Sequence, residues 1–184
     1  APDYVLVQSG VKKELVWWIK YWIRKQFGEN PLQNEDYPKI INQRHYTRLL
    51  KLLDGQRLLD GGRWREDTLQ IAPVLVDEPS WDSPLMNEEI FGPVISVRPY
   101  TDFEDVLKKA NDTEAGLTSY LFGHDARAIA RAYEVLEFGE LYVNGFSTGP
   151  MLPHCGVRES GVGCDASGWG LEEYFSLKRL SMHP

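Results

Sequence analysis

The chain has 184 residues, of which 42% are hydrophobic and 26% charged, and its formal net charge is −7. This composition is typical of an ordinary globular domain with one sizeable core, and the acidic balance argues against the concentrated basic face that nucleic-acid binding requires. No apolar run reaches transmembrane length and no signal peptide opens the chain, so we expect no nucleic-acid or membrane partner and a cytoplasmic location.

The first third of the chain predicts one strand followed by two helices. Residues 3–8 are β-branched and aromatic, which is typical of a short buried strand. Ser9 is a suitable N-cap for a long helix that ends at Gly28, and a second helix is expected over residues 42–53. We expect the apolar stripe of the first helix to lie in the core; its members are Val11, Leu15, Trp18, Ile19, Trp22 and Ile23.

From the middle of the chain onward, strands alternate with helices. A strand candidate at residues 71–76 precedes the series, which comprises strands at 94–100, 117–122 and 140–144 and helices at 102–110 and 125–136. In the second of these helices the residues expected to face the sheet are Ile129, Ala130, Tyr133 and Leu136. Alternation of this length indicates βαβ units and a parallel sheet.

The C-terminal part of the chain has a different character. Residues 145–168 form a glycine- and proline-rich loop that is too apolar for plain disorder, and loops of this length are usually functional. Cys155 and Cys164 match no zinc-ligand spacing, so we expect no metal site; a disulfide framework is not expected either, which fits a reducing compartment. Residues 175–182 alternate like an edge strand.

One stretch, Glu88-Glu89-Ile90-Phe91-Gly92-Pro93, presents side chains suited to binding a ligand. The Gly-Pro pair breaks the preceding element and begins a strand, so Glu89 and Phe91 lie on a constrained corner. A carboxylate there can accept hydrogen bonds from hydroxyl groups, and a ring two residues on can cover a flat ligand. Local chemistry by itself favours a simpler interpretation, in which Phe91 is core and the glutamates form a solvated turn.

Residues 82–94, which contain this stretch, resemble a signature of the NAD(P)-dependent aldehyde dehydrogenases. The resemblance implies that Glu89 contacts the hydroxyl groups of the nicotinamide ribose and that Phe91 lies beside the nicotinamide. Other stretches resemble the same family in the same order along the chain, and they are residues 1–7, 40–48, 111–119, 138–144, 156–163 and 170–174.

This resemblance implies an α/β fold: a parallel-sheet, three-layer catalytic domain over residues 1–174, with a C-terminal oligomerisation strand at 175–184. It implies oxidation of an aldehyde to a carboxylic acid with NAD or NADP in a homo-oligomer. In the family, the nucleophilic cysteine immediately precedes a start such as Ala1-Pro2-Asp3-Tyr4, and the general base and nucleotide-binding domain lie earlier still. We therefore expect a fragment of a longer protein, without catalytic residues and inactive alone; the alternative is a non-catalytic assembly module.

The resemblance also implies a substrate-entry wall in the C-terminal loop, formed by Phe146, Met151, His154, Cys155 and Arg158. This loop departs from the family pattern Pro-Phe-Gly-Gly-x-Lys and reads Pro-His-Cys-Gly-Val-Arg at residues 153–158. Arg158 has two interpretations: it pairs with the carboxylate of an anionic aldehyde, or it fixes the loop. The second interpretation is the simpler one. For His154, the simpler interpretation is that its side chain makes a local hydrogen bond.

Overall fold

The computed structural model describes residues 2–113, 116–146, 152–165, 170–171, 174–175 and 180–182. The contacts divide the chain into two compact units, Ala1–Phe103 and Glu104–Pro184. Among the described residues, no helix is both long and apolar enough to cross a membrane.

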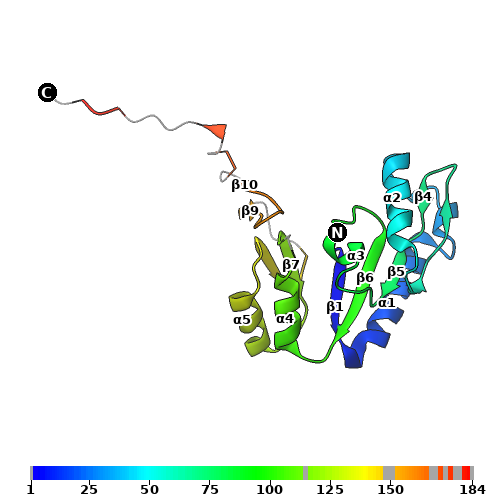
Figure 1. Cartoon of the computed structure of the whole chain (residues 1–184), viewed down its shortest axis with the longest axis horizontal. Coiled ribbons are helices and arrows are strands. Elements are labelled where there is room, and N and C mark those ends of the chain that lie inside the picture. The colour runs from blue at the N-terminus through cyan, green and yellow to red at the C-terminus, as the bar shows by residue number, and fades with distance from the viewer. Residues whose placement is uncertain are drawn as a thin grey trace. The chain divides into compact units, whose positions relative to one another are not determined.

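The first unit is built on a four-stranded sheet with the strand order β1-β6-β5-β2 (Figure 1). Strand β6 (Val94–Tyr100) pairs in parallel with both β1 (Tyr4–Gln8) and β5 (Val74–Asp77), and β2 (Leu58–Asp60) is antiparallel to β5. The valines of β5 and the inward residues of β6 are almost inaccessible to solvent, as expected where parallel strands are covered on both faces. The predicted strands at 3–8 and 94–100 and the parallel sheet are thereby confirmed.

Helix α2 (Gln43–Leu53) packs its apolar side on this sheet. Its N-terminus is capped by Asn42, whose side-chain oxygen accepts a hydrogen bond from the His45 amide at 3.0 Å. The main core cluster combines this helix, the sheet and the short helix α3 (Pro84–Asn87), and its buried members are Tyr46, Leu49, Leu52, Leu53, Ile71, Val74, Val76, Leu85, Ile90 and Val94.

The region around helix α1 (Lys12–Phe27) differs from the prediction in two respects. Ser9 is not a cap: residues Ser9–Val11 form the 3₁₀ turn η1, and the Ser9 hydroxyl donates to the Tyr100 carbonyl oxygen at 2.7 Å. None of the sixteen residues of α1, all of them described, is buried, and Trp18 and Trp22 are 44% and 47% exposed. The expectation of a core stripe was wrong because the apolar residues of α1 extend over more than one side of the helix, and only one side packs.

A small second cluster lies beside two short hairpin strands, β3 (Trp64–Arg65) and β4 (Gln70–Ile71). The turn η2 (Pro31–Gln33) contributes Leu32 to this cluster, and the buried Tyr37 donates its hydroxyl hydrogen bond to the Ile71 carbonyl at 2.7 Å. The strand predicted at 71–76 is divided into β4 and β5, because Pro73 cannot donate a backbone hydrogen bond to a ladder.

In the second unit, helices and strands alternate as predicted. Helix α4 (Phe103–Asn111) leads to β7 (Thr118–Leu121), α5 (Ala126–Val135) and β8 (Glu140–Val143), and β7 and β8 pair in parallel. The burial of α5 residues was predicted wrongly in part, because Tyr133 is 70% exposed and Ala132 is fully buried. Tyr133 lines an open apolar hollow beside Leu141 and Val143 of β8, so it stays accessible although it is on the side of α5 that faces this strand.

The cysteines form a disulfide, contrary to the sequence-based expectation. Strands β9 (His154–Cys155) and β10 (Cys164–Asp165) are antiparallel, and their register places Cys155 opposite Cys164 with 4.2 Å between the Cα atoms. This separation is close enough for a bridge once the loop folds back on itself, which spacing in the sequence could not show. Of the predicted terminal strand at 175–184, residues 176–179 and 183–184 lie outside the described part of the chain, and that strand remains a prediction.

Candidate functional site

The corner at residues 88–93 is anchored through its middle residue. The Ile90 side chain is 1% exposed within the main core cluster, and its backbone amide donates to Asp3 Oδ1 at 2.9 Å. Its neighbours Glu89 and Phe91 are exposed, and the phenylalanine ring is 75% accessible. The buried Ile90 therefore fixes the backbone of the corner, and the carboxylate of Glu89 and the ring of Phe91 project from it into solvent.

Arg48 of α2 holds the same corner from a second direction. Its guanidinium donates to the Glu89 carbonyl oxygen at 3.3 Å and to the Ile90 carbonyl oxygen, and it lies 3.4 Å from Glu88 Oε2. Arg48 lies in the stretch at 40–48 that resembles the family, but its contact with the corner could not be predicted from the sequence. A helix and a corner forty residues apart must be placed together before such a contact can be recognised.

The backbone of the corner is shaped by two special residues. Phe91 has a φ of 49°, a left-handed conformation that non-glycine residues adopt at a cost of about 1–2 kcal/mol. At Gly92 a Cβ atom would lie 2.6 Å from both Cδ atoms of the fully buried Leu49. A side chain at position 92 is thus excluded by the core, and this close approach lets the chain turn sharply into β6.

This geometry suits the two chemical roles that the sequence implied. Glu89 offers two carboxylate oxygens that accept hydrogen bonds from vicinal hydroxyl groups, as found on a ribose. The exposed Phe91 ring offers an apolar face to a flat aromatic group. Neither group is occupied in holding the fold, since the anchoring contacts are made by the Ile90 side chain and by backbone atoms.

In the second unit, the predicted residue His154 belongs to a polar cluster. Its Nδ1 lies 2.9 Å from Glu140 Oε1, and the Tyr142 hydroxyl donates to Glu140 Oε2 at 2.9 Å. Burial raises the pKa of the Glu140 carboxyl, but the hydrogen bonds from His154 and Tyr142 outweigh this effect and hold that pKa below its usual value. Glu140 is therefore kept ionised beneath His154, and sequence reasoning had not singled it out.

Arg158 makes several contacts within its own unit. It donates to the carbonyl oxygens of Asn111 and Thr113, at 2.5 and 3.0 Å, and to the Glu137 carboxylate. These contacts favour the interpretation in which Arg158 fixes the loop, because its hydrogen-bonding capacity is largely used.

The remaining predicted wall residues have different environments. The ring of Phe146 is 68% exposed and packs near Tyr120 and Phe122, with centroid separations of 5.4 and 5.3 Å. Cys155 is bonded to Cys164 and has no free thiol. Met151 lies outside the described residues.

Comparison with known proteins identifies the family. Residues 1–180 match the aldehyde dehydrogenase family. The chain belongs to this family. It is 35% identical over 166 residues to "Aldehyde dehydrogenase family 3 member A2" of Pongo abelii and 33% identical to "Aldehyde dehydrogenase, dimeric NADP-preferring" of Mus musculus, and both matches cover 89% of this chain.

Among solved structures, the "Substrate bound state of Staphylococcus Aureus AldH" superimposes on this aldehyde dehydrogenase chain with a TM-score of 0.88. The two are 32% identical, and the alignment covers 100% of this chain and 43% of the other. The chain spans about a third of the length of the two curated relatives, 34% and 37%. The α/β fold expected from the sequence is confirmed, and use of NAD or NADP is supported for the family.

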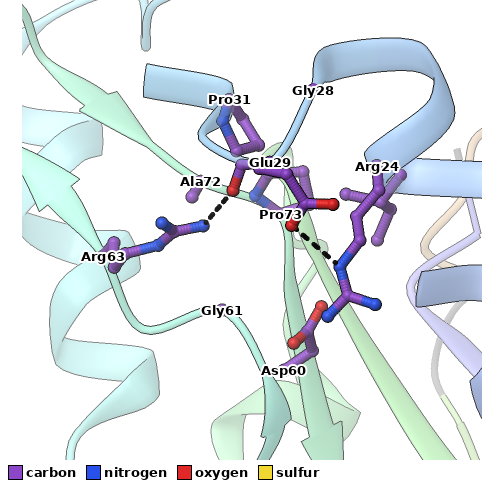
Figure 2. A pocket seen from close by; sticks show the side chains of 10 residues that line it. Arg24, Gly28, Glu29, Pro31, Asp60, Gly61, Arg63, Ala72 and Pro73 are labelled. Carbon is purple, nitrogen blue, oxygen red and sulfur yellow. Dashed lines mark hydrogen bonds and ion pairs between the residues drawn. The ribbon is translucent and has the colours of Figure 1, made fainter. Parts of the chain in front are cut away.

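Two cavities lie away from the predicted residues of this aldehyde dehydrogenase chain. The first, with a volume of about 250 Å³, lies where α1 ends, and Figure 2 shows Arg63 and Arg24 directed at Glu29 on its wall. Arg63 donates to the Glu29 carbonyl oxygen at 3.2 Å, and Arg24 lies 3.6 Å from the Glu29 carboxylate.

The second cavity, about 550 Å³, is a mostly apolar hollow between α5 and β8. The charged side chains of the first cavity already have partners, since Asp60 pairs with Lys20, so the corner at 88–93 remains the better candidate.

Proposed function

We propose that this chain forms one wall of the nicotinamide site, and the substrate-entry wall, of an NAD(P)-dependent enzyme that oxidises an aldehyde to a carboxylic acid. The observation that carries the proposal is the corner at 88–93, where Glu89 and Phe91 project from a backbone fixed by Asp3, Arg48 and the buried Ile90. Family membership supports aldehyde oxidation, and the corner gives this segment a defined part in it.

The dinucleotide, when bound, supplies the acceptor for the hydride that leaves the aldehyde carbon. Glu89 would accept hydrogen bonds from the nicotinamide ribose hydroxyls, and Phe91 would cover one face of the adjoining ring. A hydride is transferred only over a short, well-aligned distance. A rigid corner would therefore hold the nicotinamide in the reactive position better than a flexible one. Arg48 and Asp3 contribute by limiting the motion of the corner.

In the second unit, the proposed substrate-entry wall carries Phe146 and the polar cluster around Glu140. The exposed Phe146 ring would contact the apolar part of an aldehyde, and His154 would present a polar edge beside it. Arg158 would support the wall through its loop contacts instead of binding substrate.

No residue of this chain is proposed as the nucleophile or as the general base, so the chain alone is expected to be inactive. The chain mixed with an aldehyde and NAD should produce no sustained increase in NADH absorbance. Steady NADH formation that depends on the chain would contradict this part of the proposal.

The nicotinamide wall is tested by the binding of NADH to the chain, measured by NMR saturation transfer to the nicotinamide protons. We expect weak binding, with a Kd of about 1 mM, since only part of the site is present. Glu89→Gln and Phe91→Ala should reduce the transfer to the nicotinamide, whereas Glu66→Gln and Trp64→Ala, which alter an exposed carboxylate and an exposed ring elsewhere in the same unit, should not. Equal transfer in all four variants would remove the assignment.

A further inference from the structure

The solvent-facing side of α1 carries a continuous aromatic surface. It consists of Trp17, Trp18, Tyr21 and Trp22, which are 56%, 44%, 39% and 47% exposed. Residues with this spacing lie on one side of a helix. Their rings touch one another: Trp17 stacks on Tyr21 with a centroid separation of 5.6 Å, and Trp18 meets Trp17 edge-on at 4.6 Å. We call these four residues the aromatic face.

The aromatic face is the less covered side of α1. Leu15, Ile19 and Ile23 on the opposite side of the helix are half-buried and make the inward packing. A helix that is apolar on both sides normally has both sides covered, and grouped large aromatic side chains in water usually mark a binding surface. The aromatic face is therefore expected to bind a second surface.

The charge around the aromatic face indicates what that surface is. Helix α1 contains five basic residues and one acidic residue, in a chain whose net charge is −7. Lys12, Lys20 and Arg24 are paired with acids of their own unit, at 2.7 Å to Asp77, 3.6 Å to Asp60 and 3.6 Å to Glu29.

Two other lysines of α1, Lys13 and Lys25, are available to contact whatever binds the aromatic face. Among the described residues, Lys13 and Lys25 form no salt bridge, and the Lys25 ammonium lies over the Trp22 ring, 4.7 Å from its centroid. A lysine stem lying along an aromatic ring keeps its charge at the edge of an apolar surface.

We propose that the aromatic face of α1 binds the surface of an anionic lipid bilayer. Trp and Tyr favour the boundary between the headgroups and the acyl chains, and neighbouring lysines reach anionic headgroups. A helix with charges along its length lies in that boundary instead of crossing the bilayer.

A second copy of the chain fits the aromatic face less well, because pairing two α1 helices through this face would bring Lys13 and Lys25 of both copies together. This proposal adds a partner that composition and apolar run length did not predict, and it does not depend on the nicotinamide assignment.

Binding is measured by co-sedimentation of the chain with vesicles of equal parts phosphatidylglycerol and phosphatidylcholine, and with vesicles of phosphatidylcholine alone. The chain should bind the anionic vesicles, and high salt should weaken the binding. Replacing three members of the aromatic face, Trp17→Gln, Trp18→Gln and Trp22→Gln together, should weaken partitioning about tenfold or more. Trp64→Gln, which removes an exposed tryptophan of β3, is the matched control and should bind like the unaltered chain.

A second variant keeps the aromatic face and alters only charge. Lys13→Gln with Lys25→Gln should weaken binding to anionic vesicles about fivefold for each lysine and leave the melting temperature unchanged. The proposal is overturned if none of the chain sediments with anionic vesicles, or if the triple variant binds as well as Trp64→Gln. Concentration-dependent self-association that the triple variant abolishes, without vesicle binding, would identify a second copy as the occupant and overturn it equally.

Discussion

The corner at 88–93 gives its sharpest prediction through Arg48. In Arg48→Met the apolar stem of the side chain is kept and the guanidinium is lost, together with its hydrogen bonds to the carbonyl oxygens of Glu89 and Ile90. If the corner is held from α2, its backbone will open more often in this variant while the core beneath it stays folded.

The magnitude follows from the contacts. A hydrogen bond from a charged donor contributes about 1.5–3 kcal/mol, and about 1 kcal/mol is appropriate here because water can replace the guanidinium at both carbonyls. The pair with Glu88 adds little, since the Arg48 and Glu88 side chains are 29% and 51% exposed. The total is about 2 kcal/mol, which corresponds to about a thirtyfold increase in local opening.

Hydrogen exchange at the Ile90 amide measures this opening, because that amide donates to Asp3 Oδ1 and is released when the corner moves away from this carboxylate. Arg44→Met provides the matched control, as the same substitution at an exposed position one turn earlier in α2. Exchange at Ile90 should accelerate about thirtyfold in Arg48→Met and remain unchanged in Arg44→Met. Equal exchange rates in the two variants would refute the reasoning that α2 holds the corner.

Three further predictions concern stability. Burial raises the pKa of Tyr37 from 10.0 to about 12, so the unfolded chain loses this proton at a lower pH than the folded chain does. The free energy of unfolding should therefore fall by about 3 kcal/mol as the pH rises from 10 toward 12. In urea titrations, Tyr37→Phe should lack this pH-dependent loss of stability. Reducing the bond between Cys155 and Cys164, or replacing both by Ser, should destabilise the second unit by about 2–3 kcal/mol, from the nine-residue separation, as calorimetry with and without dithiothreitol would show. Gly61→Ala, whose Cβ would lie 2.4 Å from a backbone oxygen, should cost at least about 2 kcal/mol more than Gly55→Ala, a positive-φ site with open space, and equal costs would contradict the clash.

Much of the fold could be predicted from local pattern. The strand at 94–100 was predicted with the bounds that the structure shows, because it is β-branched and follows a Gly-Pro break. Helix α2 was recognised because its apolar residues repeat at helical spacing, and the structure adds that Asn42 caps it. These features are encoded within a few residues of one another, which is why a single sequence is sufficient to find them.

The failures have a common physical origin. The aromatic stripe of α1 was assigned to the core because periodicity reports which side of a helix a residue is on, but not whether anything covers that side. The disulfide depends on the register of β9 and β10. The hydrogen bonds of Arg48 to the corner depend on α2 and the corner, which are forty residues apart in the sequence. Contacts of this kind exist only after the chain has folded.

The single buried side chain at position 90 gives the corner a mechanical property. Because Ile90 is fixed in the core cluster, the positions of Glu89 and Phe91 on either side of it depend on the packing around that side chain. A substitution that repacks the core near Leu49 would tilt both groups together without touching either. Substitutions that refill the interior at positions 49, 90 or 92 are therefore expected to displace Glu89 and Phe91, the proposed nicotinamide contacts.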